Sequence, residues 1–306
     1  MNFTALFNLQ IMMFIIMIVG AYLRRKNTIT GSGKSMLTDL VIDLILPCNI
    51  ITSFYIDFSK EIFLQGLAVL LISCLIEVGC IFLAMNIYNR FPKEKKMVLQ
   101  YSTICSNAGF LGNPVIEGIY GSIGLLYASI YLIPQRIVMW SAGVSFFTES
   151  PNKRTVIKKV LTHPCIIAVF IGIFLMISQI TLPGFLSKTI SSIGGCTTPI
   201  TMLLIGAILA ESDIKSMVTK TTAGFSVLRL IIIPLMVFIG CKLTGMSSLV
   251  TGVSVILAAM PAGTTTAILA DKYDGDADFA TKCVLLTTVL SMVMIPMWCL
   301  IINASF

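Results

Sequence analysis

Long apolar stretches alternate with short polar breaks along the whole chain. The apolar segments cover roughly 5–23, 36–54, 62–88, 97–119, 123–147, 160–180, 186–210, 222–242, 246–270 and 280–303. A helix needs about 20 apolar residues to cross the hydrocarbon core of a bilayer. The pattern therefore predicts an all-α membrane protein with ten transmembrane helices.

Composition supports a bilayer rather than water as the solvent. Of the 306 residues, 57% are apolar and only 11% are charged, whereas a soluble domain carries about 25% charged residues. This excludes a soluble enzyme, a disordered protein and a nucleic-acid binder, despite the net charge of +7. We expect membrane lipids, and no nucleic acid, as the surroundings of the chain.

Basic residues are distributed unevenly between alternate loops. The loops after the first, third, fifth, seventh and ninth segments hold 16 of the 21 Lys and Arg residues, and the opposite loops hold Lys60, Lys188 and Lys242. Positively charged loops remain cytoplasmic. We therefore expect an integral protein of the bacterial inner (plasma) membrane with both termini facing outward.

The two halves of the chain share features at matching positions. Pro47 and Pro199 lie 152 residues apart, and Tyr120 and Tyr273 lie 153 apart. Five segments per half is an odd number, so the second half would be inverted, as in many secondary transporters. The alternative is a chance match between two apolar halves. The predicted repeats are 1–153 and 154–306.

Two segments gather residues that disrupt a helix or bind polar groups. They are Asn107, Gly109, Asn113 and Pro114 in the fourth segment, and Pro261, Gly263, Thr264 and Thr265 in the ninth. Proline frees backbone groups that lipid cannot solvate. We expect unwinding at 107–114 and 261–264, where free helix-start amides would attract a carboxylate. The alternative is a pair of plain proline kinks.

Ionisable residues at membrane depth are costly and are functional candidates by default. Glu77 lies in the middle of the third segment and Arg229 lies in the eighth. They are candidates for ion coupling or for an internal ion pair. Asp43, one turn before Pro47, is a candidate proton acceptor or cavity-facing carboxylate.

The sequence carries no sign of metal or enzyme chemistry. Its nine cysteines form no C-x-x-C pair and His163 is the only histidine. An intramembrane hydrolase would need a dyad such as His-Ser or paired Asp. We therefore expect no cofactor and no enzymatic activity.

Four motifs resemble those of one transporter family. Ser106–Pro114, followed by Tyr120, and Met260–Gly263, followed by Tyr273, are similar to the fourth- and ninth-helix motifs of the auxin efflux carrier family. Two further stretches, 163–168 and 229–234, are similar to its landmarks. The family includes bacterial organic-acid permeases and plant PIN-FORMED auxin exporters. Ser106 stands where plant members have proline.

The resemblance implies an NhaA-like fold of five plus five helices. Helices 5–23, 36–54, 160–180 and 186–210 would form a scaffold that dimerises through its helices 2 and 7. Residues 62–147 and 222–303 would form a moving transport domain. Within that domain, broken helices 4 and 9 would cross at the substrate site.

Arg136 lies near the centre of the fifth segment, and its guanidinium stays charged at physiological pH. Its fork of donors suits a bidentate contact with a carboxylate. The neighbouring Gln135 matches a glutamine of plant family members. The alternative for Arg136 is a permanent salt bridge to Glu77 or Glu117.

These features together predict a secondary transporter of a small organic anion, a mono- or dicarboxylate such as malate or malonate. It would work by elevator-like alternating access, with H⁺ or Na⁺ as the candidate coupling ion. The alternatives are a carrier of neutral or auxin-like weakly acidic metabolites, and a membrane sensor without transport.

Overall fold

The computed structural model describes residues 3–55, 59–147, 157, 161–210, 217–273 and 275–306. These residues form helices and no strand, apart from one isolated β-bridge. Six described segments are long and apolar enough to cross a membrane: Gly31–Ser53, Lys60–Ile87, Ala108–Gly143, Gly184–Leu209, Lys220–Leu243 and Ala277–Ser305. The prediction of an all-α chain with membrane-spanning helices is confirmed.

The chain folds into two compact units, each made of segments that are distant in sequence. The first comprises Met1–Leu64, Asn113–Ser129 and Leu161–Ser212, and the second comprises Gln65–Gly112, Ile130–Val160 and Asp213–Phe306. The boundary between the two predicted repeats lies outside the described residues.

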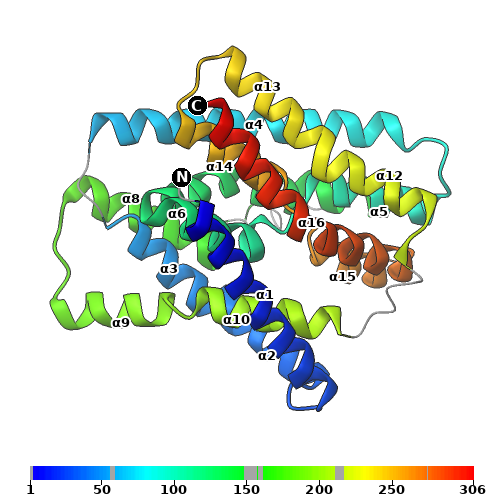
Figure 1. Cartoon of the computed structure of the whole chain (residues 1–306), viewed down its shortest axis with the longest axis horizontal. Coiled ribbons are helices and arrows are strands. Elements are labelled where there is room, and N and C mark those ends of the chain that lie inside the picture. Colours follow the sequence, from blue (N-terminus) through cyan, green and yellow to red (C-terminus); the bar gives the residue numbers. More distant parts are fainter. Residues whose placement is uncertain (1–2, 56–58, 148–156, 158–160, 211–216, 274) are drawn as a thin grey trace. The chain divides into compact units, whose positions relative to one another are not determined.

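Among the described residues, the first unit contains seven whole helices, residues 60–64 of α4 (Lys60–Ile87) and residues 113–129 of α6 (Asn113–Val138). The seven are α1 (Phe3–Arg25), α2 (Gly31–Leu40), the π-helix η1 (Val41–Ile45), α3 (Leu46–Ser53), α8 (Pro164–Ser178), α9 (Gly184–Gly194) and α10 (Thr197–Leu209). In Figure 1, α1 in dark blue crosses α10 in green. The predicted single segment 186–210 is interrupted between α9 and α10.

Glycines allow α1 and α10 to touch through their backbones. A Cβ at Gly206 would lie 1.9 Å from the carbonyl oxygen of Met17, and a Cβ at Gly20 would lie 2.1 Å from that of Leu203. No side chain fits at such a distance. Small residues of this kind let membrane helices approach closely, so packing replaces the hydrophobic force that lipid cannot supply.

The second unit holds the larger share of the chain. It contains most of α4 (Lys60–Ile87), α5 (Lys93–Ile104), the π-helices η2 (Ala108–Gly112), η3 (Met139–Gly143) and η4 (Leu228–Ile232), and α12 (Lys220–Val227), α13 (Ile233–Leu243), α14 (Ser248–Ala258), α15 (Thr265–Lys272) and α16 (Ala277–Ser305). α16 packs against α5, α12, α14 and α15. The indole of Trp298 on α16 donates to the carbonyl of Leu230 at 2.9 Å.

Three of the π-helices end two residues before a proline. They precede Pro47, Pro114 and Pro234. In each, the carbonyl four residues before the proline belongs to the middle residue of the π-helix. That carbonyl would clash with the proline ring in an α-helix. Widening the helix, as where Ile233 N donates to Leu228 O, accommodates the proline without a break.

The predicted boundary between the fourth and fifth segments falls inside α6. Gly121 interrupts that helix with φ 64° and ψ −156°. Glycine reaches this conformation without a steric penalty.

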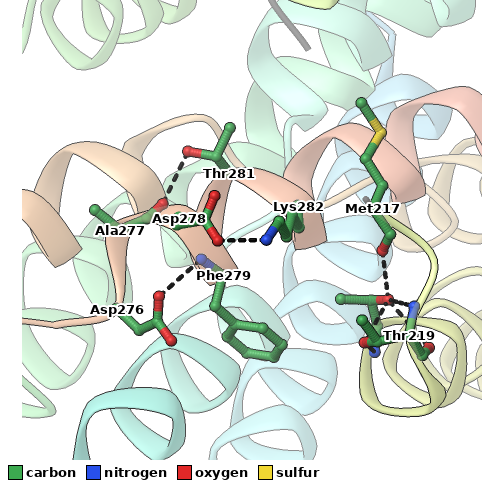
Figure 2. Close-up of polar contacts among 9 residues, drawn as sticks. Met217, Thr219, Asp276, Ala277, Asp278, Phe279, Thr281 and Lys282 are labelled. Carbon is green, nitrogen blue, oxygen red and sulfur yellow. Dashed lines mark hydrogen bonds and ion pairs between the residues drawn. The ribbon is translucent and has the colours of Figure 1, made fainter. Parts of the chain in front are cut away.

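Side-chain caps fix the starts of α12 and α16 in the second unit. Asp276 accepts a hydrogen bond from the amide of Phe279 at 2.9 Å (Figure 2). Thr219 accepts from the amide of Thr222 at 3.1 Å, and the Thr222 hydroxyl donates to the Met217 carbonyl at 2.7 Å. Each cap satisfies amides that the first helical turn leaves free.

Several helices carry fully apolar outward faces. On α4, Leu71, Leu75, Val78 and Phe82 are all exposed and follow one face of the helix. A contiguous apolar stripe of this size would be a liability in water. It fits a helix that faces lipid.

Candidate functional site

Two helices of the second unit are broken near their middle. One break separates α5, which ends at Ile104, from η2, which begins at Ala108. The other separates α14, which ends at Ala258, from α15, which begins at Thr265. The second lies where the sequence predicts it. The first break covers 105–107, whereas the sequence predicts unwinding over 107–114. The chain is helical again from Ala108, because the η2 π-helix accommodates Pro114.

The two breaks meet and exchange backbone hydrogen bonds. Asn107 N donates to Pro261 O at 2.8 Å, and Gly263 N donates to Cys105 O at 2.8 Å. This antiparallel bridge satisfies backbone groups that have no helical partner. Gly263 suits this close approach, since a Cβ there would lie 3.2 Å from the Cys105 oxygen.

Side chains brace the bridge from two neighbouring helices. Gln135 on α6 donates through Nε2 to the carbonyl of Ser106 at 2.7 Å, and its Oε1 accepts from the Ser106 hydroxyl at 3.0 Å. Thr287 on α16 accepts from the amide of Ala262 at 3.1 Å. The bridge is therefore held in one register by buried polar contacts.

Arg136 lies beside the start of η2. Its Nη2 atom is 3.7 Å from the position that a Cβ at Gly109 would occupy. The side chain is only 8% exposed, and its buried Nη1 atom has no hydrogen-bond partner among the described residues. A buried cation without a counter-charge is costly in a low-dielectric interior. The geometry leaves this guanidinium available for an anion.

The helix starts after the two breaks differ in how their amides are bonded. At α15, Thr266 N donates to Gly263 O at 3.0 Å and Ala267 N donates to Thr264 O at 3.2 Å. In the described part of the chain, the amides of Gly109 and Phe110 donate no hydrogen bond to a backbone carbonyl outside their own helix. At α15, Thr264 forms no side-chain cap, and the Thr265 hydroxyl accepts from Tyr101 at 3.3 Å. Free amides at a helix start carry partial positive charge and attract anions.

Glu77 and Arg229 are both buried in the second unit, at 5% and 3% exposure. Arg229 Nη1 donates to Thr103 O at 3.4 Å. Glu77 Oε2 and Arg229 Nε have no hydrogen-bond partner among the described residues. Arg229 is the charged side chain that acts electrostatically on Glu77.

Three predicted site residues belong to the first unit instead. Asp43 is exposed on η1, and Pro114 is buried at the start of α6. Asn113 is fully buried, and neither atom of its amide has a partner among the described residues. The structure therefore groups Asn107, Gly109, Gln135, Arg136, Pro261, Gly263, Thr264 and Thr265 in one unit and these three in the other.

Sequence reasoning missed several polar residues that support the crossing. On α16, a stripe of buried hydroxyl groups is formed by Thr287, Thr288 and Ser291. Such a stripe in an apolar helix was the available signal. Thr251 and Ser254 on α14 are also buried, without a hydroxyl partner in the described structure. Within the described residues, no group of three His, Cys, Asp or Glu side chains could hold a metal ion.

The sequence resembles transport proteins over nearly its full length. It matches the model of a family described as "Membrane transport protein" at residues 6–159 and 152–299. An "Uncharacterized transporter" of Methanothermobacter thermautotrophicus is 26% identical over 294 residues, which cover 94% of this chain and 95% of the relative. "Uncharacterized transporter MJ1031" of Methanocaldococcus jannaschii is 23% identical, with 94% and 96% covered. "Uncharacterized transporter YfdV" of Escherichia coli K12 is 21% identical, with 93% of each chain covered.

Proposed function

Since the chain belongs to the membrane transport protein family, we propose that it is a secondary transporter of a small organic anion. This is the auxin efflux carrier family that its motifs resemble. The relatives that align over their whole length are named transporters and not enzymes. The substrate that we favour is a mono- or dicarboxylate such as malonate or malate.

The observation that carries this proposal is the guanidinium of Arg136 beside Gly109, whose buried Nη1 atom has no hydrogen-bond partner among the described residues. An arginine stays charged at physiological pH, so it cannot remove the cost of its burial by losing a proton. A carboxylate would supply both the missing charge and a planar acceptor for two parallel hydrogen bonds. The free amides at the start of η2 would add donors to the same anion.

A dicarboxylate suits the site better than a monocarboxylate. One carboxylate would bind Arg136 and the start of η2. The uncapped start of α15, at Thr264 and Thr265, offers a second set of donors in the same unit. Asn107, buried at the bridge, would contact the substrate between the two helix starts.

We propose further that ten helices form two inverted repeats and that transport follows an elevator-like movement. Residues 62–147 and 222–303 would move against the scaffold. The support is that each half has one broken helix, at 105–107 and at 259–264, as at the midplane sites of secondary transporters. Glu77 and Arg229, or Asp43, would couple transport to H⁺ or Na⁺.

The proposed dimer and orientation have direct tests. We expect cysteines introduced in 36–54 and 186–210 to crosslink two copies in the bacterial inner membrane. Crosslinks formed from 97–119 or 246–270 instead would contradict the scaffold. Impermeant thiol reagents should label cysteines at both termini from outside intact cells.

The central test is uptake of radiolabelled malonate or malate by purified protein in liposomes. We expect Asn107→Ala to lower uptake at least tenfold while the protein remains folded. Asn86→Ala, an exposed asparagine on α4, is the matched control and should transport normally. Equal uptake by the two variants would remove the bridge as the substrate site. A screen of other carboxylates by thermal shift would then identify the preferred anion.

A further inference from the structure

Tyr101 is a fully buried tyrosine on α5, one helical turn before the break that follows Ile104. Its hydroxyl donates to the hydroxyl of Thr265, at the start of α15, across 3.3 Å. Both residues belong to the second unit, although 164 positions of sequence separate them. Thr265 is part of the proposed carboxylate site, so Tyr101 contacts one of the donors of that site directly.

The aromatic ring of Tyr101 is held on two sides. A Cβ at Gly143 would lie 2.9 Å from its Cε2 atom, so the ring packs against backbone where a side chain would not fit. Phe147 meets the ring edge-on, with centroids 5.5 Å apart and planes at 63°. Such T-shaped pairs are favourable and directional. A closely packed ring of this kind has few other rotamers, so its hydroxyl is kept at Thr265.

The direction of this hydrogen bond decides what Thr265 can offer a ligand. A threonine hydroxyl has one hydrogen to donate and accepts through its lone pairs. The geometry makes Tyr101 the donor, so Thr265 is the acceptor and its own hydrogen is directed elsewhere. Among the described residues, no protein group accepts that hydrogen. Thr265 is half-buried, and its hydroxyl is therefore a donor open to a ligand.

We propose that Tyr101 is a positioning residue of the carboxylate site. By occupying the acceptor side of the Thr265 hydroxyl, it directs the hydrogen of that hydroxyl at the second carboxylate of a bound dicarboxylate. A carboxylate only accepts hydrogen bonds, and successive hydrogen bonds polarise and strengthen one another. This role rests on the proposed function, in which Arg136 binds the first carboxylate. Tyr101 would thus set the preference for a dicarboxylate over a monocarboxylate without touching either.

The test compares malonate with propionate, in which a methyl group replaces one carboxylate. Calorimetric titration gives the Kd of malonate, and competition with malonate gives that of propionate. Tyr101→Phe keeps the ring and its packing but removes the hydroxyl. We expect it to raise the Kd of malonate about tenfold and to leave the Kd of propionate unchanged. A residue that only supported the fold would shift both values together.

Tyr88→Phe is the matched control, because it also removes a buried tyrosine hydroxyl that is paired with a threonine in the same unit. The hydroxyls of Tyr88 and Thr103 lie 2.9 Å apart. Both Kd values should remain those of wild type in this variant.

A double-mutant cycle tests whether Tyr101 acts through Thr265. Thr265→Val removes the hydroxyl and should raise the Kd of malonate but not that of propionate. Adding Tyr101→Phe to this variant should then change neither value further. Thr265→Ser retains a hydroxyl, so Tyr101→Phe should keep its full effect in that background.

Two results would overturn the positioning role while wild type still binds malonate. One is an unchanged ratio of the two Kd values in Tyr101→Phe, and the other is an equal effect of Tyr101→Phe with and without the Thr265 hydroxyl. If wild type binds neither malonate nor malate, the proposed function itself fails, and the role of Tyr101 fails with it.

Discussion

Replacing Arg136 by glutamine distinguishes the free-energy cost of burying the guanidinium from its contribution to substrate binding. The buried Nη1 atom of Arg136 has no hydrogen-bond partner among the described residues. Arginine at the centre of a membrane helix costs about 2.5–3.5 kcal/mol on insertion scales. Snorkelling, local thinning of the bilayer and penetrating water relieve part of such a cost in membrane proteins. We therefore expect Arg136→Gln to raise the stability of the substrate-free protein, by about 1–2 kcal/mol at most.

The same substitution should abolish stabilisation by the substrate. A ligand present at 100 times its Kd adds about 2.7 kcal/mol to the free energy of unfolding. Wild type should show this gain with its preferred carboxylate, measured as a shift of Tm in detergent and confirmed by calorimetric titration. Arg136→Gln should show none. Arg136→Lys keeps the charge but loses the planar fork, so its Kd should rise about tenfold.

Arg229→Gln is the comparison for carboxylate binding and not for transport, since Arg229 is another buried arginine of the same unit that we assign to ion coupling and not to the carboxylate. It would lose the hydrogen bond to Thr103, so the substrate-free protein should be less stable, while the Tm shift with ligand persists. The reasoning about Arg136 fails if Arg136→Gln lowers the Tm of the free protein and leaves the ligand shift intact. Arg136 would then be a structural residue, and neutral donors alone would hold the anion.

Other substitutions test the supports of the fold and the site. Gln135→Leu removes both hydrogen bonds to Ser106 and leaves the Ser106 carbonyl without a partner. We therefore expect the free energy of unfolding to fall by about 1–3 kcal/mol in titrations with SDS, together with a loss of uptake. Unchanged uptake would show that these hydrogen bonds are dispensable. Gly206→Ala places a Cβ against the Met17 carbonyl of α1, and we expect the protein to be destabilised by about 1–3 kcal/mol. Gly184→Ala is the control, because its Cβ meets no atom within 4 Å and the change should be neutral. Similar Tm values for the two variants would contradict close packing of α1 on α10. Gly121→Ala forces a side chain to φ 64° and should cost about 1–3 kcal/mol, which a Tm equal to wild type would exclude.

The sequence by itself determined the solvent, the class of fold and most helix limits. Apolar runs such as 62–88 and 280–303 correspond to α4 and α16 within a few residues. This works because lipid cannot hydrogen-bond to the backbone, so a long apolar run is forced to be helical. The break at Pro261 was also local information, since Pro261 and Gly263 lie two residues apart and both disfavour a helix.

Only the tertiary structure decided what each break contacts. Nothing near Ser106 in the chain indicates that it pairs with Ala262, and nothing near Pro114 shows that a π-helix absorbs its missing hydrogen bond. The proline stays within a continuous helical stretch, and the true gap opens at 105–107, where backbone of the other broken helix supplies the partners. Likewise, sequence placed both Arg136 and Arg229 at membrane depth, but the fold left one without a partner and gave the other the carbonyl of Thr103. The reason is that hydrogen-bond partners at membrane depth come from other helices, and their positions are set by long-range packing that one-dimensional patterns do not encode.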